Sequence, residues 1–153
     1  MPHTYLSRDA ALSAVAEFGG RLRHVSEELR NDREVVLAAV SQHGKALGYA
    51  GPDATRDREV VLAAVTQNGD ALRYAAVELR GDRELVLAAV SQYRENRHDL
   101  PTGAALSHAA DELKRDREVV LAAVKRCGLA LANAAAEMRS DHEIVLAAVK
   151  QDW

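Results

Sequence analysis

The sequence predicts an all-α fold, an α-solenoid-like stack of helix-turn-helix repeats of about 25 residues each. Three observations predict it. A nine-residue string returns along the chain at nearly constant spacing, each copy carries an apolar arc of helical period, and each copy lies between a helix-start and a helix-stop signal. We therefore expect a single helical-repeat domain that spans residues 1–153.

The repeated string defines the units of the stack. It reads Asp-Arg-Glu-Val-Val-Leu-Ala-Ala-Val from Asp32, Asp57 and Asp116, and it returns with small changes from Asp82 and Asp141. The same spacing places a degenerate first copy at Ser7, so the predicted units begin at residues 7, 32, 57, 82, 116 and 141. One copy cannot cover its own apolar face, and neighbouring copies must therefore pack on one another.

Each unit opens with a predicted helix. The Asp or Ser at its first position accepts a hydrogen bond from an unpaired backbone N–H. The Glu two residues after the Asp interacts favourably with the positive end of the helix dipole. In the unit that begins at Asp32, an arc of about 200° is covered by Val35, Val36, Leu37, Ala39 and Val40. Glu34, Ser41 and Gln42 lie on the remaining side. An arc this wide is typical of a helix with neighbours on more than one side.

A glycine register follows each first helix. We expect these glycines to end the helix with a positive φ, which glycine adopts at little cost. They are Gly19, Gly44, Gly69, Gly103 and Gly128.

A second, shorter helix is predicted after the glycine, from apolar residues such as Leu22, Val25 and Leu29 at helical spacing. A charged turn then leads to the next unit. In the unit that begins at residue 32, Gly51 and Pro52 interrupt this pattern, which predicts a shortened or kinked second helix there.

The fourth unit carries an insertion within residues 91–102, where twelve residues replace the three of other units. One interpretation is that the first helix is extended and then loops back. The other is a binding role, because functional contacts concentrate on surface loops. The candidate binding residues in this insertion are Tyr93, Arg94, Arg97 and His98.

The segment from Glu28 to Val40, followed by a Gly-x-Ala-Leu-x-Tyr-Ala segment as at residues 69–75, resembles the repeat family described as domain of unknown function 4116. The resemblance covers about residues 7–150. It implies tandem copies of one helical repeat, and it implies no established activity, cofactor or catalytic residue.

A polar and aromatic register, which we call the residue-24 column, is the first candidate surface. Each of its residues lies two positions after the central Leu of the second helix. On a continuous helix it would therefore point about 200° away from that Leu. Repeated along a stack, it forms a strip that a partner protein could bind, or each Tyr packs its ring on the adjacent repeat. The column holds His24, Tyr49, Tyr74, His108 and Asn133.

Two charged registers also repeat. They are explained by ion pairs between or within repeats, by a solvated face or by an interaction surface. The acidic register is Glu28, Asp53, Glu78, Glu112 and Glu137, and the basic one is Arg33, Arg58, Arg83 and Arg117.

Composition excludes several other functions. A net charge of −3 with both signs mixed along the chain argues against a nucleic-acid partner. Cys127 is alone and the histidines follow no metal-ligand spacing, so we predict no metal, no cofactor and no enzyme activity. No apolar run reaches the ~18 residues of a membrane span, and we expect an intracellular, cytoplasmic protein.

These patterns predict a non-catalytic protein-binding or scaffolding module whose partner is another protein. Two alternatives stay open. The chain could be a regulatory or accessory segment of a larger enzyme or effector, or it could be a structural protein that self-associates through uncapped repeat ends.

Overall fold

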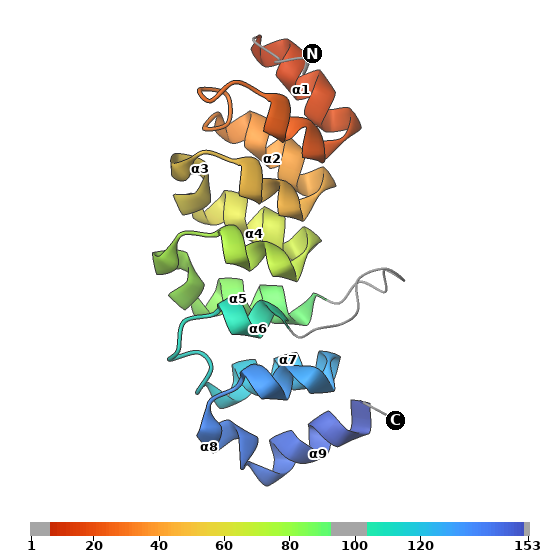
Figure 1. Ribbon diagram of the computed structural model, residues 1–153, viewed down its shortest axis with the longest axis vertical. Helices are drawn as coiled ribbons and strands as arrows, with labels where there is room; N and C mark the ends of the chain where they lie inside the picture. Colours follow the sequence, from red (N-terminus) through yellow and green to blue (C-terminus); the bar gives the residue numbers. More distant parts are fainter. Residues whose placement is uncertain (1–6, 93–103, 152–153) are drawn as a thin grey trace.

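The computed structural model describes residues 7–92 and 104–151, and every regular element in these ranges is a helix. The helices stack in sequence order into an elongated body of two layers (Figure 1). The fold predicted from the repeats, an all-α stack of helical units, is therefore confirmed.

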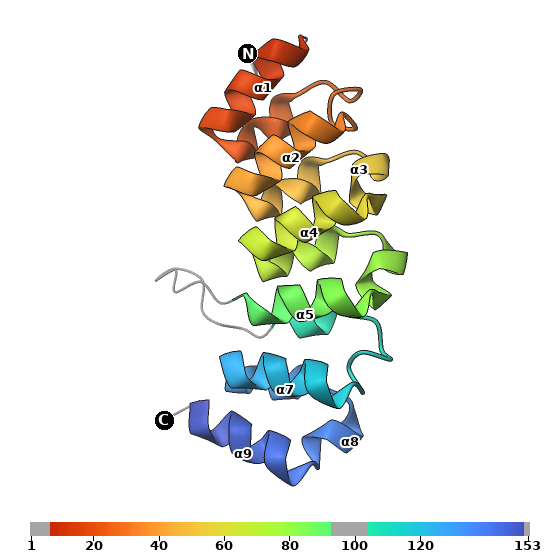
Figure 2. The same cartoon turned by 180° about the vertical axis from the view of Figure 1, so that it is seen from behind.

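The first layer consists of the α-helices that open the units, and successive members of this layer contact one another (Figure 2). Each begins directly after a Ser or Asp whose side chain accepts hydrogen bonds from the backbone N–H groups of the first turn, as predicted. The helices are α1 (Arg8–Glu17), α2 (Arg33–Gln42), α4 (Arg58–Gln67), α5 (Arg83–Ser91), α7 (Arg117–Arg126) and α9 (His142–Gln151).

The second layer differs from the prediction, because most of its elements are short 3₁₀-helices followed by an extended residue such as Val25 (φ −82°, ψ 148°). A 3₁₀-helix has three residues per turn, so Gly19, Leu22 and Val25 lie above one another and are all buried. The continuous second α-helix expected from the sequence is therefore wrong. The elements are η1 (Gly19–His24), η2 (Gly44–Tyr49), η3 (Gly69–Tyr74), α6 (Ala104–His108) and η5 (Gly128–Asn133).

Short helices lead from the second layer to the next unit. They are α3 (Pro52–Arg56), η4 (Val77–Gly81) and α8 (Ala136–Arg139). Pro52 occupies the first turn of α3, where its missing N–H costs nothing, and η2 before it has the same length, six residues, as η1 and η3. The expected interruption of the second helix is therefore wrong, since Pro52 begins a separate helix.

The glycines after the first helices have a different role from the one predicted. Gly19, Gly44 and Gly69 are buried, and none of the three has a positive φ. The helix before Gly69 ends at Asn68 in an extended conformation (φ −153°, ψ 113°). A Cβ atom on Gly69 would lie 2.1 Å from the carbonyl oxygen of Ala89 in the next unit. Glycine is needed here for close approach of two backbones.

Small aliphatic side chains form a continuous core between the two layers. The fully buried residues of α4 show its composition: Val60, Val61, Ala64 and Val65. Among the described residues, no polar or charged side chain is buried. The stack is therefore stabilised by apolar contact between consecutive units, and its charged side chains lie at the surface.

Candidate interaction surfaces

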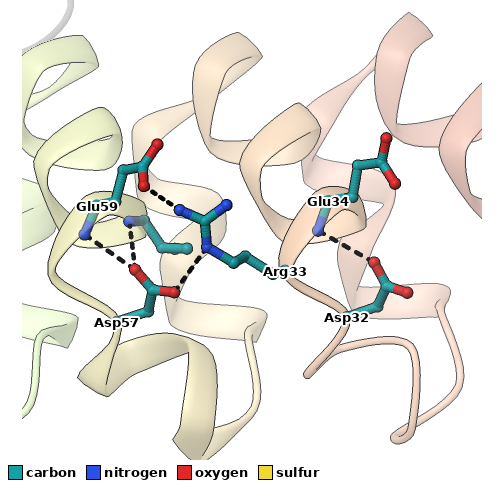
Figure 3. A network of polar contacts seen from close by, with 6 residues as sticks. Asp32, Arg33, Glu34, Asp57 and Glu59 are labelled. Atoms are coloured by element: carbon teal, nitrogen blue, oxygen red, sulfur yellow. Dashed lines mark hydrogen bonds and ion pairs between the residues drawn. The ribbon is translucent and has the colours of Figure 1, made fainter.

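In each of the first five units an arginine bridges to the next unit in the same way, and Figure 3 shows one of these bridges. In the example drawn, Nε of Arg33 donates to Oδ2 of Asp57 at 2.9 Å, and Nη2 of Arg33 pairs with the carboxylate of Glu59. The other oxygen of Asp57, Oδ1, accepts hydrogen bonds from the backbone N–H groups of Glu59 and Val60, with N···O distances of 2.9 and 3.2 Å. One carboxylate therefore both caps its own helix and binds the preceding unit.

These contacts keep the groups charged. The hydrogen bond from Arg58 lowers the pKa of Asp82, and the backbone N–H groups of Leu85 and Glu84 lower it further. Correspondingly, the hydrogen bond to Asp82 raises the pKa of Arg58. Because the arginines are about half exposed, each bridge adds little stability.

The acidic and basic registers do not form ion pairs with each other among the described residues. Arg33 reaches forward to the unit that begins at Asp57, and no ion pair between Arg33 and Glu28 is seen. The basic register thus belongs to the contacts between units. The residues of the acidic register are all exposed: Glu28, Asp53, Glu78, Glu112 and Glu137.

The residue-24 column lies at the ends of consecutive second-layer elements, which contact one another. Its members differ in exposure. Tyr49 is 41% exposed, whereas Tyr74 is half-buried. A Cβ on Gly48 would lie 2.8 Å from Cε1 of Tyr74, so that ring packs against the preceding unit. The guanidinium of Arg73 lies 5.2 Å from the centre of the Tyr74 ring, within the range of a cation–π contact.

The two histidines of the column have cationic side chains as neighbours. Nε of Arg23 donates to Nε2 of His24 at 2.7 Å. Partial burial lowers the pKa of His108, and the positive charges of Arg73, Arg80 and Lys114 lower it further, although Asp70 opposes them. Burial and these charges therefore favour the neutral form of His108. Asn133 continues the column, half-buried, at the end of η5.

The four candidate residues of the insertion, Tyr93, Arg94, Arg97 and His98, lie outside the described residues. In the part of the chain that the structure describes, no three His, Cys, Asp or Glu side chains gather as a metal site would require. Cys127 is half-buried where α7 ends. None of the described helices is long and apolar enough to cross a membrane.

A hollow that sequence reasoning missed lies between α7 and α9, with a volume of about 280 Å³. We call it the lysine groove. Its lining residues are Leu121, Lys125, Glu143, Leu146, Ala147, Lys150 and Gln151. A signal was present in the sequence: at the register of Lys125 and Lys150, earlier units have the small residues Ala16, Ser41, Thr66 and Ser91.

Comparison with known proteins identifies one family. The model of a family described as "Domain of unknown function (DUF4116)" matches residues 7–53, 57–114, 102–138 and 116–153. These matches cover most of the chain and follow its repeats. Neither the curated proteins nor the solved structures compared with the chain gave a match.

Proposed function

Because the chain belongs to the family described as domain of unknown function 4116, which names no activity, we propose its function from its own surfaces. The protein is a non-catalytic scaffold that binds another protein through the residue-24 column. The observation that carries this proposal is the position of the column, which runs along contacting second-layer elements and places one polar or aromatic side chain in each unit. Repeat proteins bind partners along extended surfaces of this kind.

The chemistry of the column supports a protein partner. Tyr49 presents a half-exposed ring, and Arg73 stacks over the neighbouring ring of Tyr74. Tyr and Arg are the residue types enriched at the energetic centres of protein interfaces, because each combines a flat apolar surface with hydrogen-bond donors. Tyr74 is already packed on Gly48, so it supports the surface, and Tyr49 supplies the exposed contact.

The test compares proteins captured from a cell extract by the wild type and by the variant Tyr49→Ala with Arg73→Gln. Neither substitution removes a buried side chain, so the fold should be kept and far-UV circular dichroism should be unchanged. A matched control, Ser41→Ala with Thr66→Ala, changes two exposed positions of the first layer. We expect captured proteins to be lost with the column variant and kept with the control. Identical capture by all three proteins would overturn the proposed site.

A second candidate function is self-association, and the surface of α9 favours it. Val149 is 51% exposed, although Val40 and Val65 at the same register are fully buried, and Leu146 is 45% exposed. At the other end, α1 has Ala10, which is exposed, at the register where other units have a larger apolar residue. The apolar face of α9 is thus a better partner for α9 of a second copy than for α1.

Light scattering over a dilution series tests this candidate. A dimer through α9 should double the mass of 16.6 kDa at high concentration, and Val149→Lys should restore the monomer. A monomer at every concentration would exclude it.

A further inference from the structure

We propose that the lysine groove between α7 and α9 binds an acidic, amphipathic helical segment of a partner protein. The inference rests on the proposed function as a protein-binding module, and it adds a second site and the chemistry of its occupant. It uses the other layer of the stack from the residue-24 column, so the two sites can be tested separately.

The groove has an apolar floor and a positive end. Leu121, Leu146 and Ala147 line the floor. Lys125 follows Leu121 by four residues and Lys150 follows Leu146 by four, so each lysine lies one helical turn beyond a floor leucine on the same face. Along the groove, an occupant would therefore contact apolar surface, and one helical turn further towards the ends of α7 and α9 it would contact the two ammonium groups.

The bridge between the two helices places both lysines at the same end. Arg117 at the start of α7 pairs with Asp141 and Glu143 at the start of α9, so the helices run in the same direction. Lys125 and Lys150 consequently meet where both helices end. Glu143, which lines the opposite end, is held by Arg117, and that pairing offsets its charge.

Comparison with other units shows that the lysines are particular to this groove. Between α2 and α4 the corresponding floor residues are Leu37 and Leu62, and the positions of the lysines hold Ser41 and Thr66. Those helices have the same length and the same Asp N-cap as α7, so the helical repeat does not require lysine at this register. The charge is therefore available for recognition.

These features identify the class of occupant. A helix can lay leucines three or four positions apart on the floor while carboxylates one turn further reach the two ammonium groups. Leu146 is 45% exposed, which leaves apolar surface in the groove for such a helix to cover. Charge complementarity selects acidic over basic or neutral segments.

The test uses a fluorescein-labelled peptide of about 15 residues, long enough for partial helicity, built from Ala, Leu and Glu with leucines on one face and glutamates at one end. Binding to the full chain is followed by fluorescence anisotropy at low salt. We expect Lys125→Gln with Lys150→Gln to weaken binding by about three- to tenfold, as two exposed ion pairs allow, and Lys125→Arg with Lys150→Arg to restore it. Both lysines are exposed, so these variants should fold normally.

Two further arms make the result specific. Ser41→Lys with Thr66→Lys should strengthen total binding by creating a second basic groove over Leu37 and Leu62. A peptide with Gln in place of Glu should bind the wild type and the Lys-to-Gln variant equally weakly.

Equal affinity of the wild type and the Lys-to-Gln variant for the acidic peptide would overturn the proposal, as would equal binding of a peptide with the same composition but scattered leucines. The variant Tyr49→Ala with Arg73→Gln should bind the acidic peptide like the wild type. Loss of captured proteins in that variant therefore reports on the residue-24 column alone, and loss of peptide binding in the lysine variant reports on the groove alone.

Discussion

Replacing Gly69 by alanine should destabilise the stack, because the added Cβ would meet backbone. The atom would lie 2.1 Å from the carbonyl oxygen and 3.0 Å from the carbonyl carbon of Ala89. Since ordinary van der Waals contact begins near 3.4 Å, η3 and α5 would have to separate by about 1 Å or more. Both sides of the contact are backbone in buried segments, so no flexible side chain can move away.

The expected loss is about 1–3 kcal/mol or more, the usual cost of overpacking a close-packed interior. For a chain of this size each kcal/mol lowers Tm by about 2–4 °C, so a decrease of roughly 2–12 °C is expected. The matched control is Gly81→Ala. Gly81 also lacks a positive φ, and the nearest atom to its added Cβ is Cβ of Ala110 at 3.8 Å. It should gain about 0.4–1 kcal/mol through a less flexible unfolded chain.

Thermal and urea unfolding followed by circular dichroism would measure both variants, and Gly69→Asn would separate close approach from a requirement for a positive φ. Asparagine tolerates a positive φ well but is larger than alanine. Close approach therefore predicts that Gly69→Asn is at least as damaging as Gly69→Ala. A Tm for Gly69→Asn above that of Gly69→Ala, or equal Tm values for Gly69→Ala and Gly81→Ala, would refute the reasoning.

Three other outcomes are expected. Val61→Asp should cost several kcal/mol, of the order of 3–5, by burying an unpaired charge, whereas Val77→Asp at a 74% exposed position should leave Tm within about 2 °C of wild type. Asp82→Ala should cost about 0.5–2 kcal/mol in urea unfolding through loss of a helix cap, and Asp82→Asn, which keeps the accepting oxygen, should cost less. The pKa values of Asp32 and Asp116 are lowered by hydrogen bonds from Arg8 and Arg83, so their contribution to stability is complete above about pH 5, decreases as pH falls past the unfolded-state value of about 3.9, and is lost through the lower folded-state values. Tm should accordingly fall between pH 5 and about pH 3, and an unchanged Tm over this range would contradict the assignment.

The first layer could be predicted from sequence because its signals are local. Asp57 caps the helix that begins one residue later, and Val60, Val61, Ala64 and Val65 repeat at the helical period. The second layer could not be predicted in the same way. Leu22, Val25 and Leu29 fit an α-helix by spacing, and only the packing against the next unit decides that the segment winds as a 3₁₀-helix and turns at Val25.

The candidate surfaces could not be predicted from residue spacing alone, because they are formed by contacts between units. Arg33 lies 24 residues from Asp57, and the two meet only because consecutive units stack. Tyr49 and Tyr74 occupy one register but differ in role, because Gly48 makes room for the second ring. The change to Lys125 and Lys150 was visible in the chain, but its meaning required knowing that this register lines a groove.

The order of contacts along the stack has a mechanical consequence. The main helix contacts within the described chain join elements of one unit or of adjacent units. A tensile load applied between the two ends would therefore act on a series of similar junctions, each held by one patch of aliphatic contact and one arginine bridge. Such a body should lengthen in discrete steps, one unit at a time, and should shorten again by the same steps when the load is released.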